Sequence, residues 1–75
     1  MNQDYELKRK DIGLRIRELR LAAGYGSYET FAVKYGFGRR NYWSLENGSN
    51  FKINTLLKIA SVHNITLEEF FKGVE

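Results

Sequence analysis

The chain has 75 residues, of which 43% are hydrophobic and 28% charged, and its formal net charge is +3. A chain of this length supports one domain with a small core. The absence of cysteine excludes a disulfide framework and a thiolate metal site. No stretch approaches the ~18 apolar residues of a membrane span, and the start lacks the apolar segment of a signal peptide, so we expect a cytoplasmic protein.

Charge is distributed unevenly along the chain. Residues 8–52 carry ten Lys and Arg against four Asp and Glu, a net +6, whereas both flanks are slightly acidic. A central basic segment favours a polyanionic partner such as nucleic acid. We predict one domain over residues 1–75, with its core in 8–72 and with residues 1–7 as an N-terminal extension that frays or lengthens the first helix.

Apolar residues recur at helical spacing, which predicts an all-α protein with five helices. The first predicted helix ends at Gly24, and its inner face consists of Tyr5, Ile12, Ile16, Leu19 and Ala23. Ser27 is a suitable N-cap for a second helix over residues 28–35, and Glu29 suits its first turn. A third helix over 39–46 follows a three-residue turn and stops at Asn47 and Gly48.

Two further helices complete the predicted fold. The fourth has an apolar stripe and ends at Asn64, a plausible left-handed C-cap; the stripe consists of Ile53, Leu56, Leu57, Ala60 and Val62. Thr66 and Glu69 form a capping box that opens the last helix. That helix carries Leu67, Phe70 and Phe71, and one short helix does not easily bury both phenylalanines. One of them is therefore a candidate dimer contact.

Two short helices joined by a glycine-containing turn form a helix-turn-helix, whose second helix enters the DNA major groove. Gly36 permits the turn, and Phe37 packs between the helices. Gly38 takes the N-cap position, where a missing side chain also allows close approach to a phosphate. If Tyr42 and Leu45 face the core, the outer face of the helix consists of the base-reading candidates Arg39, Arg40, Trp43 and Ser44.

Most of the chain, from about Ile12 to Phe71, resembles the Xre-type, phage-repressor and Cro-like helix-turn-helix regulators. The matching segments are IGLRIRELRLAAG, SYETFAVKYGFGRRNYWSLENG and INTLLKIASVHNITLEEFF. The resemblance implies a five-helix lambda-repressor-like domain that reads bases with Arg39, Arg40 and Ser44. It also implies phosphate-holding amides near Tyr28 and at Asn47 to Gly48, and a structural ion pair between Arg20 and Glu46. The family usually has glutamine where this chain has Tyr28.

The chemistry of the outer face supports DNA contact, with alternatives. The planar fork of an arginine spans O6 and N7 of guanine. Two arginines in a first turn oppose the helix dipole, which a nearby phosphate would reverse, but they are also compatible with a solvated surface. Trp43 either touches a thymine methyl or sugar, or folds back against Phe51 as part of the core.

Polar residues around the two short helices form the predicted phosphate-contacting set. Lysine in a loop beside the DNA backbone is a sequence-independent contact. Asn41 is equally compatible with a simple exposed position, and the loop after the third helix with an ordinary polar connection. The predicted phosphate candidates are Ser27, Tyr28, Gly38, Asn41, Asn47, Gly48, Ser49, Asn50 and Lys52.

The first predicted helix carries a second apolar line. Leu7, Leu14 and Leu21 are spaced by seven residues and lie opposite the core stripe. This spacing is that of a coiled-coil seam, so the line is a candidate dimer or partner surface. Isolated exposed leucines are also normal on protein surfaces.

Motifs for catalysis, metal binding and cofactor binding are lacking. The G-x-G pairs in GYGSYE and GFGRRN lack the preceding strand and third glycine of a dinucleotide loop. His63 is the sole histidine, and we expect it to cap a helix or lie on the surface.

We therefore expect a protein that is not an enzyme and needs no cofactor. The favoured function is a sequence-specific regulator of transcription that binds double-stranded DNA as a homodimer on a palindromic operator. The alternative is a protein-binding adaptor or antitoxin-like module that uses the Leu7, Leu14 and Leu21 line.

Overall fold

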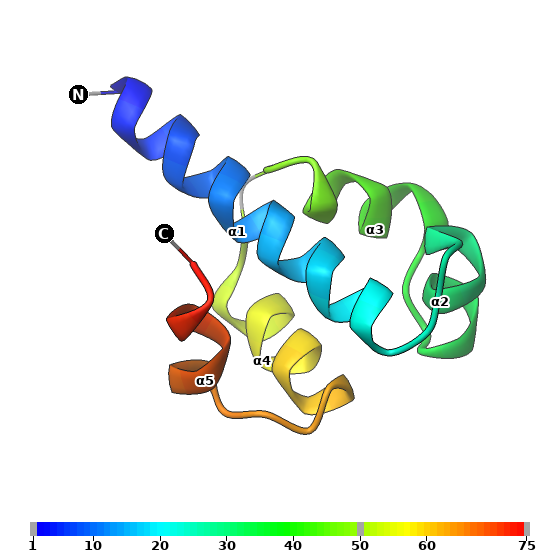
Figure 1. The fold of residues 1–75 in the computed structure, drawn as a ribbon. Coiled ribbons are helices and arrows are strands. Elements are labelled where there is room, and N and C mark those ends of the chain that lie inside the picture. Colours follow the sequence, from blue (N-terminus) through cyan, green and yellow to red (C-terminus); the bar gives the residue numbers. More distant parts are fainter. Residues whose placement is uncertain (1, 50, 75) are drawn as a thin grey trace.

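The computed structural model describes residues 2–49 and 51–74, with side chains from residue 5. This part of the chain forms the helices α1 (Asn2–Ala22), α2 (Tyr28–Lys34), α3 (Arg39–Glu46), α4 (Ile53–Val62) and α5 (Leu67–Lys72). In Figure 1, α2 and α3 lie on one side of α1 and α4 and α5 on the other, while the first turns of α1 project beyond the remaining helices. The predicted all-α fold of five helices is confirmed. None of the helices described combines the length and apolar content of a membrane span.

Local signals in the sequence set the helix ends. The Ser27 hydroxyl accepts the backbone N–H of Thr30 at 3.2 Å and caps α2. The Thr66 hydroxyl accepts the Glu69 N–H at 3.0 Å, and the Glu69 carboxylate accepts the Thr66 N–H at 3.0 Å, which completes the predicted capping box. Asn64 has φ 58°, the left-handed conformation predicted for the end of α4.

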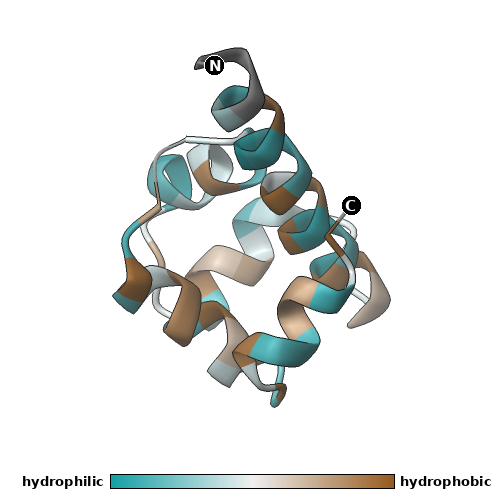
Figure 2. Ribbon diagram, turned by 90° about the vertical axis from the view of Figure 1, so that its left-hand side faces the viewer, coloured by the Kyte–Doolittle hydropathy of each residue, from teal (hydrophilic) through white to brown (hydrophobic). Residues whose placement is uncertain are grey.

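Phe31 of α2 lies at the centre of the core and is fully buried. Aromatic rings from α3 and from the connections that follow α1, α2 and α4 surround it at centroid distances of 4.7–6.4 Å: Tyr25, Tyr35, Phe37, Tyr42 and His63. Aromatic side chains bury large areas and pair in tilted or edge-to-face geometry, so a small core built from them is well filled. Hydrophilic and hydrophobic residues alternate along the helices (Figure 2), as expected for helices that each turn one face to a core.

Four positions of the predicted apolar stripes are wrong. Tyr5 is 66% exposed because it lies on the projecting turns of α1, and Ala23 is exposed because α1 has ended there. Ile53 and Leu57 are 59% and 47% exposed. Helix α4 buries Leu56 and Ala60 of the predicted stripe, together with Ile59. The predicted stripe was therefore wider than the face that α4 turns to the core.

Phe70 is not a surface residue, which corrects its prediction as a dimer candidate. The ring is fully buried, and the Arg15 guanidinium lies 5.9 Å from its centroid. Arg15 also donates from Nε to the Phe70 carbonyl at 2.8 Å and from Nη2 to the Glu69 carbonyl at 3.0 Å. These bonds fasten α5 to α1 with Phe70 inward, and they leave Phe71 40% exposed.

His63 is more deeply placed than a surface residue. It is the C-cap of α4, and its N–H donates to the Ile59 carbonyl at 3.2 Å, so the capping expectation is confirmed. Its ring stacks on Phe31 at 5.3 Å with an angle of 11°, and its Nε2 is buried. Burial, and then the positive charge of Arg15, lower the pKa of His63.

We predict that mild acid destabilises the fold through His63. Because the pKa of His63 is lowered by folding, the unfolded chain binds the proton at a higher pH than the folded chain does. The free energy of unfolding should therefore fall as the pH drops through the unfolded pKa of about 6.5. Urea unfolding between pH 7.5 and 5.5 measures this. His63→Phe retains the stacked ring and should show a flat profile; a flat profile for the original chain would contradict the prediction.

Candidate nucleic-acid interface

A tight turn holds α2 and α3 at a defined angle. Tyr35 ends α2, Gly36 follows with φ 77°, and the Phe37 N–H returns to the Ala32 carbonyl at 2.8 Å. A residue with a side chain rarely adopts this φ, so glycine is needed at position 36. Phe37 is half-buried against the core, and Gly38 is the N-cap of α3 without a side-chain cap. The predicted helix-turn-helix geometry is present.

The buried face of α3 fixes which side chains point outward. Tyr42 is fully buried and Leu45 is 8% exposed. At 100° per residue, this orientation turns Arg40 and Trp43 away from the core, and Trp43 is 49% exposed. Trp43 therefore does not belong to the core, whereas Phe51 is partly buried against it.

The four base-reading candidates do not form one cluster. Arg40 and Trp43 line a recess with Tyr28 of α2. Arg39 lies to one side, in a shallow recess with Glu29 and Val33 of α2. Ser44 lies to the other side, facing α4. The four candidates therefore lie in three separate places on the surface of α3: Arg40 with Trp43, Arg39, and Ser44.

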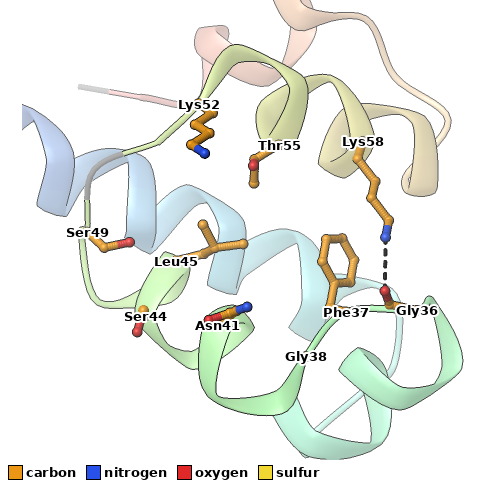
Figure 3. A pocket seen from close by; sticks show the side chains of 10 residues that line it. All are labelled: Gly36, Phe37, Gly38, Asn41, Ser44, Leu45, Ser49, Lys52, Thr55 and Lys58. Carbon is orange, nitrogen blue, oxygen red and sulfur yellow. Dashed lines mark hydrogen bonds between the residues drawn. The ribbon is translucent and has the colours of Figure 1, made fainter.

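A hollow of about 520 Å³ separates α3 from α4. It collects four of the predicted phosphate candidates, which are Gly38, Asn41, Ser49 and Lys52. In Figure 3, Asn41 from one wall and Lys52 and Thr55 from the other point into the same space. The amide, hydroxyl and ammonium groups that line this hollow are hydrogen-bond donors that an anion can accept.

Lys58 and Thr55 line this hollow and were missed from the sequence. The Lys58 ammonium donates to the Gly36 carbonyl at 3.0 Å and lies 4.3 Å from the centroid of the Phe37 ring (Figure 3). It therefore fastens α4 to the turn. The only signal in the sequence was a lysine on a helix whose other face is apolar, which does not predict a partner 22 positions away.

The remaining phosphate candidates are used within the fold or lie elsewhere. The Ser27 hydroxyl caps α2, and Tyr28 is half-buried beside it. The N–H groups of Asn47 and Gly48 donate to carbonyls of α3, and the Asn47 amide donates to the Trp43 carbonyl at 2.8 Å. A helix C-terminus repels anions, so these amides suit capping better than phosphate binding. Asn50 lies outside the described residues.

Comparison with known proteins identifies the family. No protein-family model matches the chain, and no curated protein matches it. A solved structure does: the restriction-modification controller protein C.AhdI from Aeromonas hydrophila is 36% identical, with a TM-score of 0.73. The match covers 84% of this chain and 96% of that chain. The chain belongs to the Xre-type helix-turn-helix family.

The Xre-type domain contains the predicted ion pair between α1 and the end of α3. Arg20 donates from Nε to Glu46 Oε2 at 2.7 Å and from Nη2 to Oε1 at 3.0 Å, and the two side chains are 6% and 8% exposed. Arg20 Nη1 also donates to the Tyr25 carbonyl at 2.9 Å. The hydrogen bond to Glu46 raises the pKa of Arg20. Burial, followed by the nearby Glu46 carboxylate, raises the pKa of Tyr42.

The leucine line of the Xre-type domain lies on the surface. Leu7, Leu14 and Leu21 are 58%, 53% and 48% exposed along α1. They lie on a different face of α1 from the buried residues Ile16 and Arg20. The three leucines therefore remain available to a partner.

Proposed function

We propose that this chain is a sequence-specific regulator of transcription that binds double-stranded DNA with α3 in the major groove. The main support is the outer surface of α3, where Arg40 and Trp43 point away from the core and a tight turn joins α2 to α3. An arginine fork matches the O6 and N7 edge of guanine. The similarity to a protein described as a controller supports a regulatory role.

The hollow between α3 and α4 is proposed to hold the DNA backbone next to the groove. Lys52 supplies charge there, and Asn41, Ser49 and Thr55 supply neutral donors. Such contacts position a protein on the duplex without reading sequence. Arg39 is proposed as a second base or phosphate contact on the opposite flank, beside α2.

Selection from a pool of random duplexes tests the function, followed by titration of the winning duplex against salt. We expect a two-fold-symmetric site and an affinity that falls with salt in proportion to the phosphates neutralised. Weak binding that is equal on all sequences would contradict sequence-specific regulation.

Removing both arginines at the start of α3 should abolish selective binding. The variant Arg39→Ala/Arg40→Ala is expected to bind the selected duplex about 100-fold more weakly, because a bidentate guanine contact contributes roughly 1–3 kcal/mol. Fluorescence anisotropy of a labelled duplex measures this. Arg39→Lys/Arg40→Lys keeps the charge but not the fork, so it should retain non-selective binding alone. Arg17→Ala, which removes an exposed charge from α1, should have little effect.

A homodimer is proposed to form through the exposed apolar residues of α4 and α5. Ile53 and Leu57 are one turn apart on α4, and Phe71 is exposed on α5, which packs against α4. Exposed apolar side chains gathered on adjacent elements mark association surfaces. A two-fold dimer with recognition helices about 34–36 Å apart would read the two halves of a palindrome.

Charge placed in this surface should separate the two protomers. Leu57→Lys is expected to sediment as a monomer and to bind a two-half-site duplex at least about tenfold more weakly, since the second half-site contact is lost. Sedimentation equilibrium and anisotropy measure these effects. Leu14→Lys is the matched control on α1. If only Leu14→Lys dissociates the dimer, the leucine line is the interface.

The leucine line also supports a second candidate function, an adaptor or antitoxin-like module that binds a protein. Its basis is the exposure of all three side chains, Leu7, Leu14 and Leu21, on one helix. The arginine variants separate this function from DNA binding, because they should leave a partner bound to α1 unaffected.

A further inference from the structure

The recess between Tyr28, Arg40 and Trp43 has an unusual combination of walls. Its volume is about 280 Å³, and two of its three lining side chains are aromatic while the third is a planar cation. It opens at the outer surface of α3, where Trp43 is 49% exposed. The recess would therefore face the edges of the bases if α3 occupies the major groove.

The aromatic walls are held by the fold. Tyr28 is half-buried and packs against the core, and it is the first residue of α2, whose N-terminus is capped by Ser27. The orientation of Trp43 follows from α3, which is fixed by the burial of its neighbours Tyr42 and Leu45. A preformed site loses little conformational entropy when it binds.

The chemistry of the walls selects one kind of group. Among the groups at base edges in the major groove, the 5-methyl of thymine is apolar, and the others donate or accept hydrogen bonds. Aromatic faces suit a methyl group and satisfy few donors or acceptors. Arg40 at the rim suits the O6 and N7 acceptors of a guanine.

Spacing links the methyl group to that guanine. Side chains three positions apart on a helix have Cβ atoms about 5–6 Å apart, comparable with one or two base steps of about 3.4 Å. Arg40 and Trp43 are three positions apart, so they reach neighbouring base pairs. Tyr28, from α2, closes the recess on the far side.

We propose that the recess of Tyr28, Arg40 and Trp43 binds the 5-methyl group of a pyrimidine next to a guanine held by Arg40. The proposal rests on the DNA-binding function proposed above and assigns Trp43 as a specificity-determining residue. Two bases carry this methyl group, thymine and 5-methylcytosine, and the recess recognises the chemistry that they share.

Replacing thymine by deoxyuridine tests the proposal, because it removes the methyl group and nothing else. At one thymine in one half of the selected duplex, deoxyuridine should weaken binding about fourfold, the effect of one buried methyl group. In Trp43→Ala this ratio should fall to about one, whereas Trp43→Phe should keep part of it. Tyr5→Ala removes another exposed aromatic residue, on α1, and should leave the ratio unchanged.

Cytosine and 5-methylcytosine at the same position distinguish the two sources. For either source, the methylated cytosine should bind more tightly than cytosine. Tighter binding of thymine than of 5-methylcytosine identifies an unmodified site, and the reverse order identifies a methylated one.

Two results would overturn the inference while leaving DNA recognition intact. One is equal affinity for the selected duplex and its fully deoxyuridine-substituted copy. The other is a Trp43→Ala variant that keeps the full thymine preference, which would show that the methyl group does not lie against Trp43. Failure to select any duplex would overturn the proposed function and the inference together.

Discussion

Replacing Arg20 by alanine is expected to lower the free energy of unfolding by about 3–5 kcal/mol. The side chain is 6% exposed and makes two hydrogen bonds to Glu46 and one to the Tyr25 carbonyl. Without Arg20, the Glu46 carboxylate is left unpaired in a place that water reaches poorly. For a small domain this loss approaches the whole stability. Urea unfolding followed by circular dichroism measures it.

Two variants separate the geometry of this ion pair from its charge. Arg20→Lys keeps the charge, but a single ammonium cannot reproduce the three directed bonds of the guanidinium, so most of the loss should remain. Arg17→Ala, at an exposed position of the same helix, should change the stability by no more than about 0.5 kcal/mol. A loss below about 1 kcal/mol for Arg20→Ala would show that the pair is not structural. If Arg20→Ala binds DNA more weakly, the loss should match the fraction of the variant that is unfolded, because Arg20 is assigned a structural role.

Gly13→Ala is expected to destabilise the protein by about 3 kcal/mol, although alanine is the better helix former by about 1 kcal/mol. A Cβ atom at position 13 would lie 2.6 Å from the Glu46 carbonyl oxygen and 2.9 Å from the Gly48 nitrogen. Both contacts are with backbone atoms, which cannot move aside as a side-chain tip can. Helix α1 and the end of α3 would have to separate, and thermal and urea unfolding would detect the loss.

Gly26→Ala is the matched control for this prediction. A Cβ atom at position 26 would meet nothing within 4 Å, and its φ is not in the left-handed region. Alanine there should be neutral or stabilise by about 0.4–1 kcal/mol, because it restricts the unfolded chain. If Gly13→Ala is stabilising as well, the close approach of α1 to α3 is wrong.

The helix ends were predictable because their causes are local. Ser27, Thr66 and Glu69 act on residues three positions away, and Asn64 ends the helix immediately before it. The rotation of α3 was predictable for the same reason, since Tyr42 and Leu45 are the buried pair at helical spacing. The resemblance to the Xre-type family added the Arg20 and Glu46 pair, which spacing alone did not reveal.

The burial of individual stripe residues was less predictable. An apolar stripe can be wider than the face that a neighbour covers, so Ile53 and Leu57 satisfied the helical pattern and yet lie on the surface. Tyr5 belongs to the first turns of α1 and is 66% exposed, and Phe70 is selected over Phe71 by the bonds from Arg15. These outcomes depend on where other helices lie.

The five helices, the caps of α2, α4 and α5 and the outward face of α3 followed from local sequence patterns, because each depends on residues within about one turn. The packing of the helices in three dimensions fixed which residues lie together. It set Gly13 against the backbone of Glu46 and Gly48, stacked His63 on Phe31, and enclosed Arg40 and Trp43 with Tyr28. The physical reason is that contacts between residues distant in the sequence depend on how helices pack, and local periodicity does not encode the partner.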